Sequence, residues 1–230
     1  MKTGISKIVL TAAIFITIVA SAHADQSPQA ARGNNALSSL VIPRDELAYG
    51  RSYGEWAAAW WQWVLSIPSD AHPLLNTADC TTGQSGPVFF LGGTFVTGPV
   101  QRSCTVPSGK SLFFPILNEL RASFPPPFVT INDQRSLNAA DLDGATLGVD
   151  LGGKELRSLN TDFRVQSVTF DVTLPDNNLL GIPTGAYSVA TDDGYYVMLK
   201  PLKPGNYVLH ITGSDSLVQL DVTYNLTISK

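Results

Sequence analysis

The sequence predicts a mainly β protein, an antiparallel β-sandwich or jelly-roll with one N-terminal amphipathic, tryptophan-rich helix packed on it. Three observations support this prediction. Short runs of β-branched and aromatic residues recur between glycine and proline residues through most of the chain. One capped segment that begins near residue 52 has helical periodicity. Residues 218–228 alternate between apolar and polar side chains, which is typical of a strand with one buried face.

The helix is predicted between Ser52 and Pro68. Ser52 is followed three residues later by Glu55, which is the pattern of a capping box, and Pro68 ends the helix because it lacks an N–H. The segment holds all four tryptophans of the chain. The residues expected on its buried stripe are Tyr53, Trp56, Trp60, Trp63, Val64 and Ile67, and those expected opposite are Glu55, Ala59, Gln62 and Ser66.

The buried tryptophans explain why this helix can organise the fold. An indole buries on the order of 200 Å², so three of them on one stripe can anchor a whole sheet face. Trp61 lies off that stripe by about 80–100°. Two interpretations of Trp61 therefore stay open: a further core residue, or a partly exposed ring beside Gln62 that could stack on a sugar.

The N-terminus predicts export. Lys2 and Lys7 precede an apolar run over residues 8–20 and the small-residue site Ala22-His23-Ala24, so residues 1–24 are expected to be a signal peptide. Residues 25–35 are expected to form a flexible leader, and residues 36–230 a single β-sandwich domain. Without its signal peptide the chain has 13 basic and 19 acidic residues, a net charge of −6, and no second long apolar run. That charge argues against nucleic acid or an anionic membrane as the main partner.

Two cysteines, Cys80 and Cys104, remain in the exported part. A disulfide between them is expected in an oxidising compartment, where closing the loop removes about 3.5 kcal/mol of unfolded-state entropy in the simple chain model. Two free thiols are the alternative. A metal site built on two isolated cysteines is disfavoured, because no histidine pair accompanies them.

Turn signals divide the rest of the domain. Leu37–Ile42 is expected to be a short strand or clip, and Pro107-Ser108-Gly109 is expected to turn a hairpin between Arg102–Val106 and Lys110–Leu117. The proline-rich stretch 124–128 is expected to be an internal seam. Gly152-Gly153 predicts a second hairpin turn, and Asp192-Asp193 a turn before Gly194.

Three blocks of this sequence carry a family resemblance. They are Tyr53-Gly54-Glu55-Trp56 with Trp60-Trp61-Gln62-Trp63, the segment Gln84–Gly92, and Cys104-Thr105-Val106-Pro107-Ser108-Gly109-Lys110 leading into Phe113-Phe114-Pro115. Together they resemble a family of exported bacterial proteins of unassigned function. The resemblance implies export, the disulfide and a helix-plus-sheet plan, and it brings no catalytic residues.

Enzyme signatures are missing from the sequence. Gly83-Gln84-Ser85-Gly86 lacks the spacing of a nucleophile elbow, and Asp141-Leu142-Asp143-Gly144 lacks the third acidic position and closing glutamate of a calcium loop. No metal or cofactor is therefore expected. The candidate acids or bases are Glu55, His72 and Asp192, although a lone histidine is more often structural.

Three functional hypotheses follow. The first is a secreted or periplasmic binding module that recognises a glycan or an envelope protein near the helix and the disulfide loop, through Trp61, Gln62 and Arg102. The second is an exported enzyme that acts on a glycan, with Glu55, His72 or Asp192 as acid or base. The third is a purely structural envelope protein.

Overall fold

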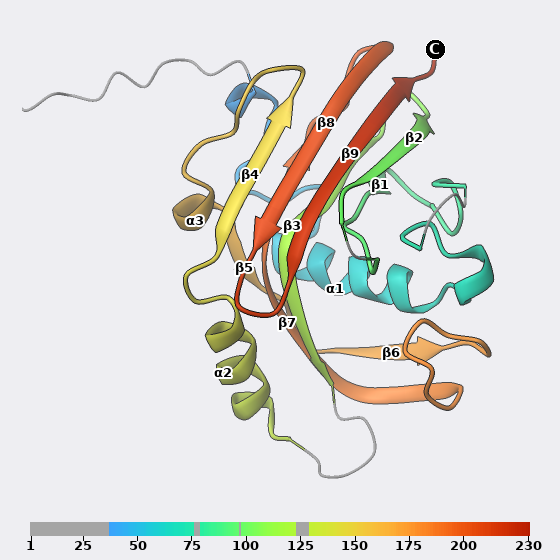
Figure 1. Ribbon diagram of the computed structural model, residues 1–230, viewed down its shortest axis with the longest axis vertical. Coiled ribbons are helices and arrows are strands. Elements are labelled where there is room, and N and C mark those ends of the chain that lie inside the picture. Colours follow the sequence, from blue (N-terminus) through green and yellow to red (C-terminus); the bar gives the residue numbers. More distant parts are fainter. Residues whose placement is uncertain (1–36, 76–78, 97, 123–128) are drawn as a thin grey trace, which may run out of the picture. The chain divides into compact units, whose positions relative to one another are not determined.

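The computed structural model describes residues 37–75, 79–96, 98–122 and 129–230, which belong to one compact unit. Two β-sheets and a buried helix dominate this unit (Figure 1). The predicted signal peptide (1–24), the predicted leader (25–35) and the predicted seam (124–128) lie outside the described residues.

The nine strands among the described residues form two mixed sheets. The first sheet has the order β1-β3-β7-β5, and β6 pairs with β7 beyond this path; the second has the order β2-β9-β8-β4. The strands are β1 (Val88–Phe90), β2 (Val100–Val106), β3 (Ser111–Ala122), β4 (Thr146–Leu151), β5 (Arg164–Gln166), β6 (Phe170–Leu174), β7 (Gly185–Leu199), β8 (Gly205–Ser214) and β9 (Gln219–Ile228). Most pairs are antiparallel, but β1 pairs parallel to β3 and β2 parallel to β9.

The first sheet is the middle layer of the unit, because both of its faces are buried. Along β7, Tyr195 and Val197 belong to the core shared with the second sheet, whereas Tyr196 and Met198 belong to the core shared with the helix α1 (Tyr53–Leu65). Neighbouring residues of a strand point to opposite faces, so one strand supplies both cores. The prediction of a mainly β fold, consistent with a sandwich and with the tryptophan helix packed on it, is confirmed.

Helix α1 begins as predicted. Glu55 N–H donates to Ser52 Oγ at 3.3 Å, and Ser52 N–H donates to Glu55 Oε2 at 2.8 Å, which completes the capping box. The helix ends at Leu65, before Pro68. All six residues of the predicted stripe are buried, and of the opposite set Glu55, Gln62 and Ser66 are exposed while Ala59 is half-buried.

The predicted hairpin between Arg102–Val106 and Lys110–Leu117 is wrong. These segments correspond to β2 and β3, which lie in different sheets. Strand β2 pairs with β9, whereas β3 lies between β1 and β7. The physical reason is burial. Residues Ser111–Leu117 are buried without alternation, so both faces of this strand need a covering layer, as in a central strand. The turn at residues 107–109 therefore carries the chain from one sheet to the other.

Asp192 and Asp193 do not form the predicted turn. They lie within the long strand β7, and Asp193 is paired with Glu119 of β3 and with Gln166 of β5. The sequence suggested a turn because two acidic residues precede Gly194. In the folded protein both carboxyl groups obtain buried hydrogen-bond partners, so the strand continues through them.

Other local predictions are confirmed. Gly152 and Gly153 adopt positive φ values of 61° and 80°, and Leu151 and Lys154 exchange backbone hydrogen bonds across them. Residues 37–42 form a clip: the short 3-10 helix η1 (Ser38–Leu40) is followed by a bridge from Val41 to Leu199. Strand β9 alternates in burial as predicted, with the buried residues Leu220, Val222, Tyr224, Leu226 and Ile228.

The sequence did not predict helix α2 (Ile131–Asp141), which packs against β3 and β7. Helix α3 (Leu159–Asp162) and the 3-10 helix η2 (Ser69–Ala71) are single turns.

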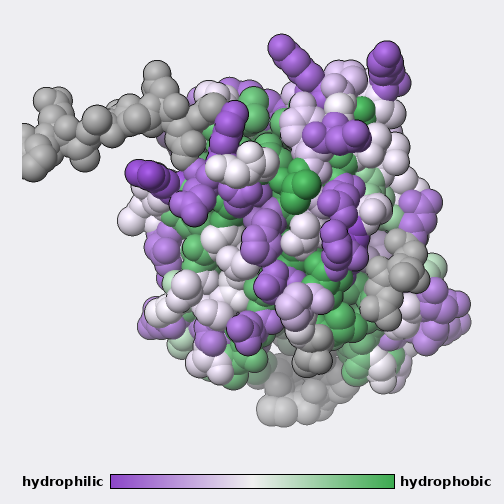
Figure 2. Space-filling model, turned by 45° about the horizontal axis from the view of Figure 1, so that its top comes forward, coloured by the Kyte–Doolittle hydropathy of each residue, from purple (hydrophilic) through white to green (hydrophobic). Residues whose placement is uncertain are grey.

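The outer face of the second sheet is polar. There His210 Nε2 lies 2.9 Å from Asp221 Oδ1. Figure 2 shows a side of the molecule on which hydrophilic side chains predominate and apolar ones are scattered.

Candidate functional site

A groove of about 520 Å³ runs along the exposed flank of α1, a size within the range of small-ligand pockets. One wall is the helix and the other is the segment that leads into and begins β6, and Val189 of β7 also lines the groove. The lining residues are Arg51, Glu55, Ala58, Ala59, Gln62, Val168, Thr169, Phe170, Asp171 and Val189. We refer to this hollow as the α1–β6 groove.

Small residues of α1 create the groove. Ala58 and Ala59 present only methyl groups to it, so the wall recedes between Glu55 and Gln62. At the start of the helix, a Cβ on Gly54 would lie 2.7 Å from the backbone oxygen of Gln166. Glycine therefore lets α1 approach the neighbouring chain closely and fixes the width of the groove at that end.

Charged and amide groups line both walls. The Arg51 guanidinium lies 5.0 Å from the ring centroid of Trp56, in cation–π geometry. Glu55 Oε2 accepts hydrogen bonds from the backbone N–H and the hydroxyl of Ser52, which lower the pKa of the Glu55 carboxyl. Glu55 is thus a fixed carboxylate. At the far end, Gln62 Nε2 donates to the carbonyl oxygen of Asp171 at 3.0 Å.

Trp61 does not reach the groove surface. Its side chain is 7% exposed, and its indole N–H donates to Asp192 Oδ1 at 2.7 Å. Of the two interpretations of Trp61 that the sequence left open, the core residue is therefore confirmed, and the partly exposed ring is not. The reason is the width of the first sheet: β7 and β6 extend under this flank and bury it, a feature that helical periodicity alone cannot foresee.

Asp192 is the most unusual carboxyl group of the described residues. It is fully buried, and its Oδ1 accepts from Trp61 and, at 2.8 Å, from the hydroxyl of Tyr196, while Oδ2 has no hydrogen-bond partner. Burial raises the pKa of Asp192 to about 8, against the opposing effect of the two hydrogen bonds. Asp193 points to the other face, where Arg164 and Gln166 bind its carboxylate.

His72 is a core residue rather than an exposed base. It is 1% exposed, its Nδ1 accepts from the backbone N–H of Leu74 at 3.1 Å, and its Nε2 lies 2.9 Å from the carbonyl oxygen of Val64. These two contacts define a neutral tautomer with the proton on Nε2. Burial lowers the pKa of His72, which keeps the ring neutral.

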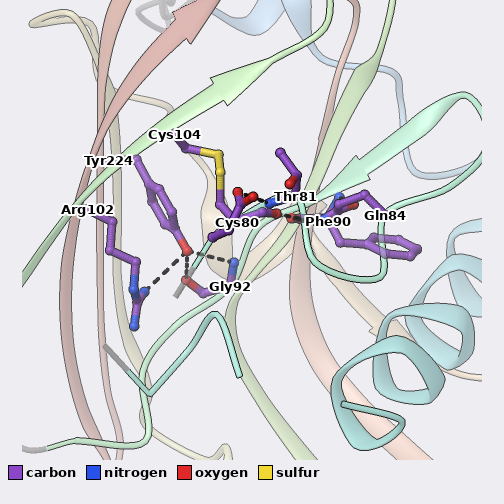
Figure 3. The surroundings of a disulfide bond; sticks show 9 residues. Cys80, Thr81, Gln84, Phe90, Gly92, Arg102, Cys104 and Tyr224 are labelled. Carbon is purple, nitrogen blue, oxygen red and sulfur yellow. Dashed lines mark hydrogen bonds between the residues drawn. A yellow bond between two sulfur atoms is a disulfide. The ribbon is translucent and has the colours of Figure 1, made fainter. Parts of the chain in front are cut away.

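Arg102 is buried beside the disulfide (Figure 3). Nη1 donates to the carbonyl of Gly93 at 2.7 Å and to the Tyr224 hydroxyl at 3.2 Å, and Nη2 donates to the carbonyl of Leu74 at 2.9 Å. Cys104, which lies two residues after Arg102 in β2, forms the predicted disulfide with Cys80. Both links hold loops between α1 and β2 against the second sheet.

The structure thus separates the six predicted site residues into three places. Glu55 and Gln62 line the α1–β6 groove, Trp61 and Asp192 are bonded together beneath α1, and His72 and Arg102 lie within buried loop contacts. Glu55 and Val64, whose carbonyl oxygen contacts His72, are nine residues apart on α1, a rise of about 13.5 Å at about 1.5 Å per residue. Glu55, His72 and Asp192 therefore do not form one catalytic cluster, and their catalytic roles stay predictions.

Sequence reasoning missed Arg51 and Asp171 in the groove and Tyr196 beside Asp192. The alanine run in the helix was the available signal, because small residues on an exposed helix flank leave room for a ligand. Asp141, part of the incomplete calcium motif, binds Arg121, and no cluster of three or more potential metal ligands occurs within the described parts of the chain. No helix among those residues is long and apolar enough to cross a membrane.

Comparison with family models, curated proteins and solved structures finds no significant match to this chain.

Proposed function

We propose that this protein is an exported binding module whose ligand occupies the α1–β6 groove. The observation that carries the proposal is the groove itself, which is lined by charged and amide groups on two walls that the buried core holds in place. The disulfide and the signal-like N-terminus support export, as does the resemblance to exported bacterial proteins. An envelope protein or glycan is the expected partner.

The enzyme hypothesis receives less support. The pKa of Glu55 is lowered, which makes it a poor general acid near neutral pH, and Asp192 has no exposed surface. Both ring nitrogens of His72 are hydrogen-bonded to backbone groups, so neither is free to exchange a proton with a substrate. Binding without turnover is therefore the preferred function.

A groove-filling variant tests the proposal. Ala59→Trp should fill the groove from an incompletely buried position of α1, and Asn225→Trp, on the polar outer face of the second sheet, is the matched control. The wild type and both variants would be applied to glycan and peptide arrays, with mass spectrometry of the bound material to detect turnover. Binding by the wild type and Asn225→Trp that Ala59→Trp abolishes, with no product, supports the proposal.

Two results would contradict it. Binding that survives Ala59→Trp would place the ligand elsewhere on the protein. Product formation that Glu55→Gln abolishes would favour the enzyme hypothesis instead.

A further inference from the structure

The α1–β6 groove reaches the open edge of strand β6, where Phe170 and Asp171 belong to its lining. Strand β6 pairs with β7 on one side only. On its other side it runs beside α1 (Figure 1), and no strand among the described residues covers that edge. An uncovered edge presents backbone N–H and C=O groups that can pair with another chain.

The contacts of two carbonyl groups show which residues face the groove. The carbonyl of Leu174 accepts from Thr184 Oγ1 on the β7 side, whereas the carbonyl of Asp171 accepts from Gln62 of α1. Backbone groups of successive strand residues point alternately to the two edges. Within β6, the backbone groups of Asp171 and Thr173 therefore point toward the unpaired edge, and Asp171 also lines the groove.

The Gln62 side chain shows what chemistry this edge accepts. Its amide N–H₂ donates to the Asp171 carbonyl oxygen at 3.0 Å, an ordinary N–H···O distance. The side chains of Thr169 and Asp171 are exposed beside it, and a ligand chain would displace the exposed Gln62 side chain from this carbonyl. The Asp171 carbonyl thus already accepts from one amide group, as it would from the backbone of an added strand.

The groove length suits a short peptide. From Glu55 to Gln62, the part of α1 that lines the groove, the helix wall extends about 10 Å. An extended chain rises about 3.3 Å per residue, so about three residues fit. Glycan stacking is less favoured, because Phe170, the one aromatic ring in the lining, is only 7% exposed.

We infer that the ligand of the α1–β6 groove is an extended peptide segment of a partner protein, which adds as a strand to the open edge of β6 beneath α1. This inference rests on the proposed binding function and names its partner class. Main-chain pairing with β6 supplies affinity, and the charged side chains Arg51, Glu55 and Asp171 supply selectivity.

The probe is a phage-displayed library of random peptides, selected on the wild-type protein and counter-selected on Ala59→Trp. Enriched peptides would be synthesised and their Kd measured by fluorescence anisotropy. We expect Ala59→Trp to weaken binding at least about tenfold, as for loss of a central contact, and Asn225→Trp to leave it unchanged. Asp171→Pro, which removes the N–H facing the groove, should weaken it about threefold to tenfold, and Asp171→Ala less.

Ester substitutions in the peptide leave the protein untouched and so remain decisive if Asp171→Pro fails to fold. Replacing each peptide N–H by an ester oxygen in turn should weaken binding about twofold to tenfold at every second position, because only alternate residues face β6. No enrichment over the counter-selection, or ester losses without this period, would overturn the peptide inference. Glycan binding abolished by Ala59→Trp would overturn it while leaving the groove function intact, whereas no ligand sensitive to Ala59→Trp would overturn both.

Discussion

Two helices cover opposite faces of the same pair of strands, β3 and β7, and different kinds of side chain attach them. Helix α1 buries four indoles against one face. Helix α2 buries Gln134 and Asn138 against the other face. Their contacts on β7 are adjacent residues: Trp61 binds Asp192, and Asn138 binds Thr191.

In α1, large apolar area and hydrogen bonding coincide. Each indole N–H has an acceptor, so no polar atom of the four rings is buried unpaired. The acceptors are the carbonyl of Ala48 for Trp56, the carbonyl of Leu91 for Trp60, Asp192 Oδ1 for Trp61 and the carbonyl of Thr82 for Trp63, at 2.9, 2.7, 2.7 and 3.0 Å.

In α2, amide groups replace apolar area. Asn138 Nδ2 donates to the carbonyl of Thr191 at 3.1 Å, and Gln134 Nε2 donates to the carbonyl of Val189 at 3.2 Å. The apolar residues Ile131 and Leu137 are instead 41% and 46% exposed. A net hydrogen bond stabilises by only about 1 kcal/mol, so α2 should be the weaker attachment.

The largest expected effect is that of Trp60→Ala. Trp60 is 2% exposed at the centre of the core beneath α1, and its removal leaves a cavity and an unpaired Leu91 carbonyl. We expect a loss of about 3–5 kcal/mol in the free energy of unfolding, measured by urea denaturation. A loss below about 1 kcal/mol would show that α1 is not the anchor.

Trp61→Ala should be nearly as harmful, at about 3 kcal/mol, because this ring is buried as well. It also leaves Tyr196 as the one donor to Asp192 Oδ1. Trp61→Phe, which keeps most of the area and deletes the N–H, should cost about 1–2 kcal/mol. If both variants melted like the wild type, the burial of this flank would be disproved.

Asp192, beneath α1, gives the folded protein a pH dependence. Its pKa is raised to about 8 in the folded protein by burial, with smaller contributions from Asp193 and Glu119, and is about 3.9 in an unfolded chain. The folded state therefore holds the proton more tightly between these values. The contribution of Asp192 to stability is greatest at low pH and falls by up to about 1.4 kcal/mol per unit as the pH rises toward 8.

Asp192→Asn tests this dependence, since the amide oxygen can still accept from Trp61 and Tyr196 but the side chain no longer titrates. Melting curves from pH 5 to 9 should lose most of their downward slope in the variant. Asp45→Asn, at an exposed position, is the control and should retain the slope. An unchanged slope in Asp192→Asn would assign the dependence to other groups.

The contrast between the helices also marks how far the sequence was predictive. Helix α1 was predictable because Ser52, the tryptophan spacing and Pro68 agree, and each signal is local. Helix α2 was not, because Gln134 and Asn138 become a buried face only when β7 supplies Thr191 as their partner. The same limit applies to the site: the helix wall of the groove was partly predicted through Glu55 and Gln62, but Asp171 enters it only through the sheet.

The smallest expected effects concern α2, where they can separate hydrogen bonding from packing. Asn138→Ala should cost about 1–2 kcal/mol, since it removes the donor to a buried carbonyl of β7. Asn138→Leu restores the side-chain volume without the hydrogen-bond donor. If the side-chain hydrogen bond holds α2 on the sheet, this variant should remain destabilised. If packing volume holds α2, its stability should approach that of the wild type. The neighbouring Leu137→Ala, on the exposed side, should change stability by less than about 0.5 kcal/mol.

Hydrogen exchange of the backbone amides along α2 would measure the local opening of this helix directly. A larger effect of Leu137→Ala than of Asn138→Ala would reverse the proposed contrast, because α2 would then also be held by its apolar side chains.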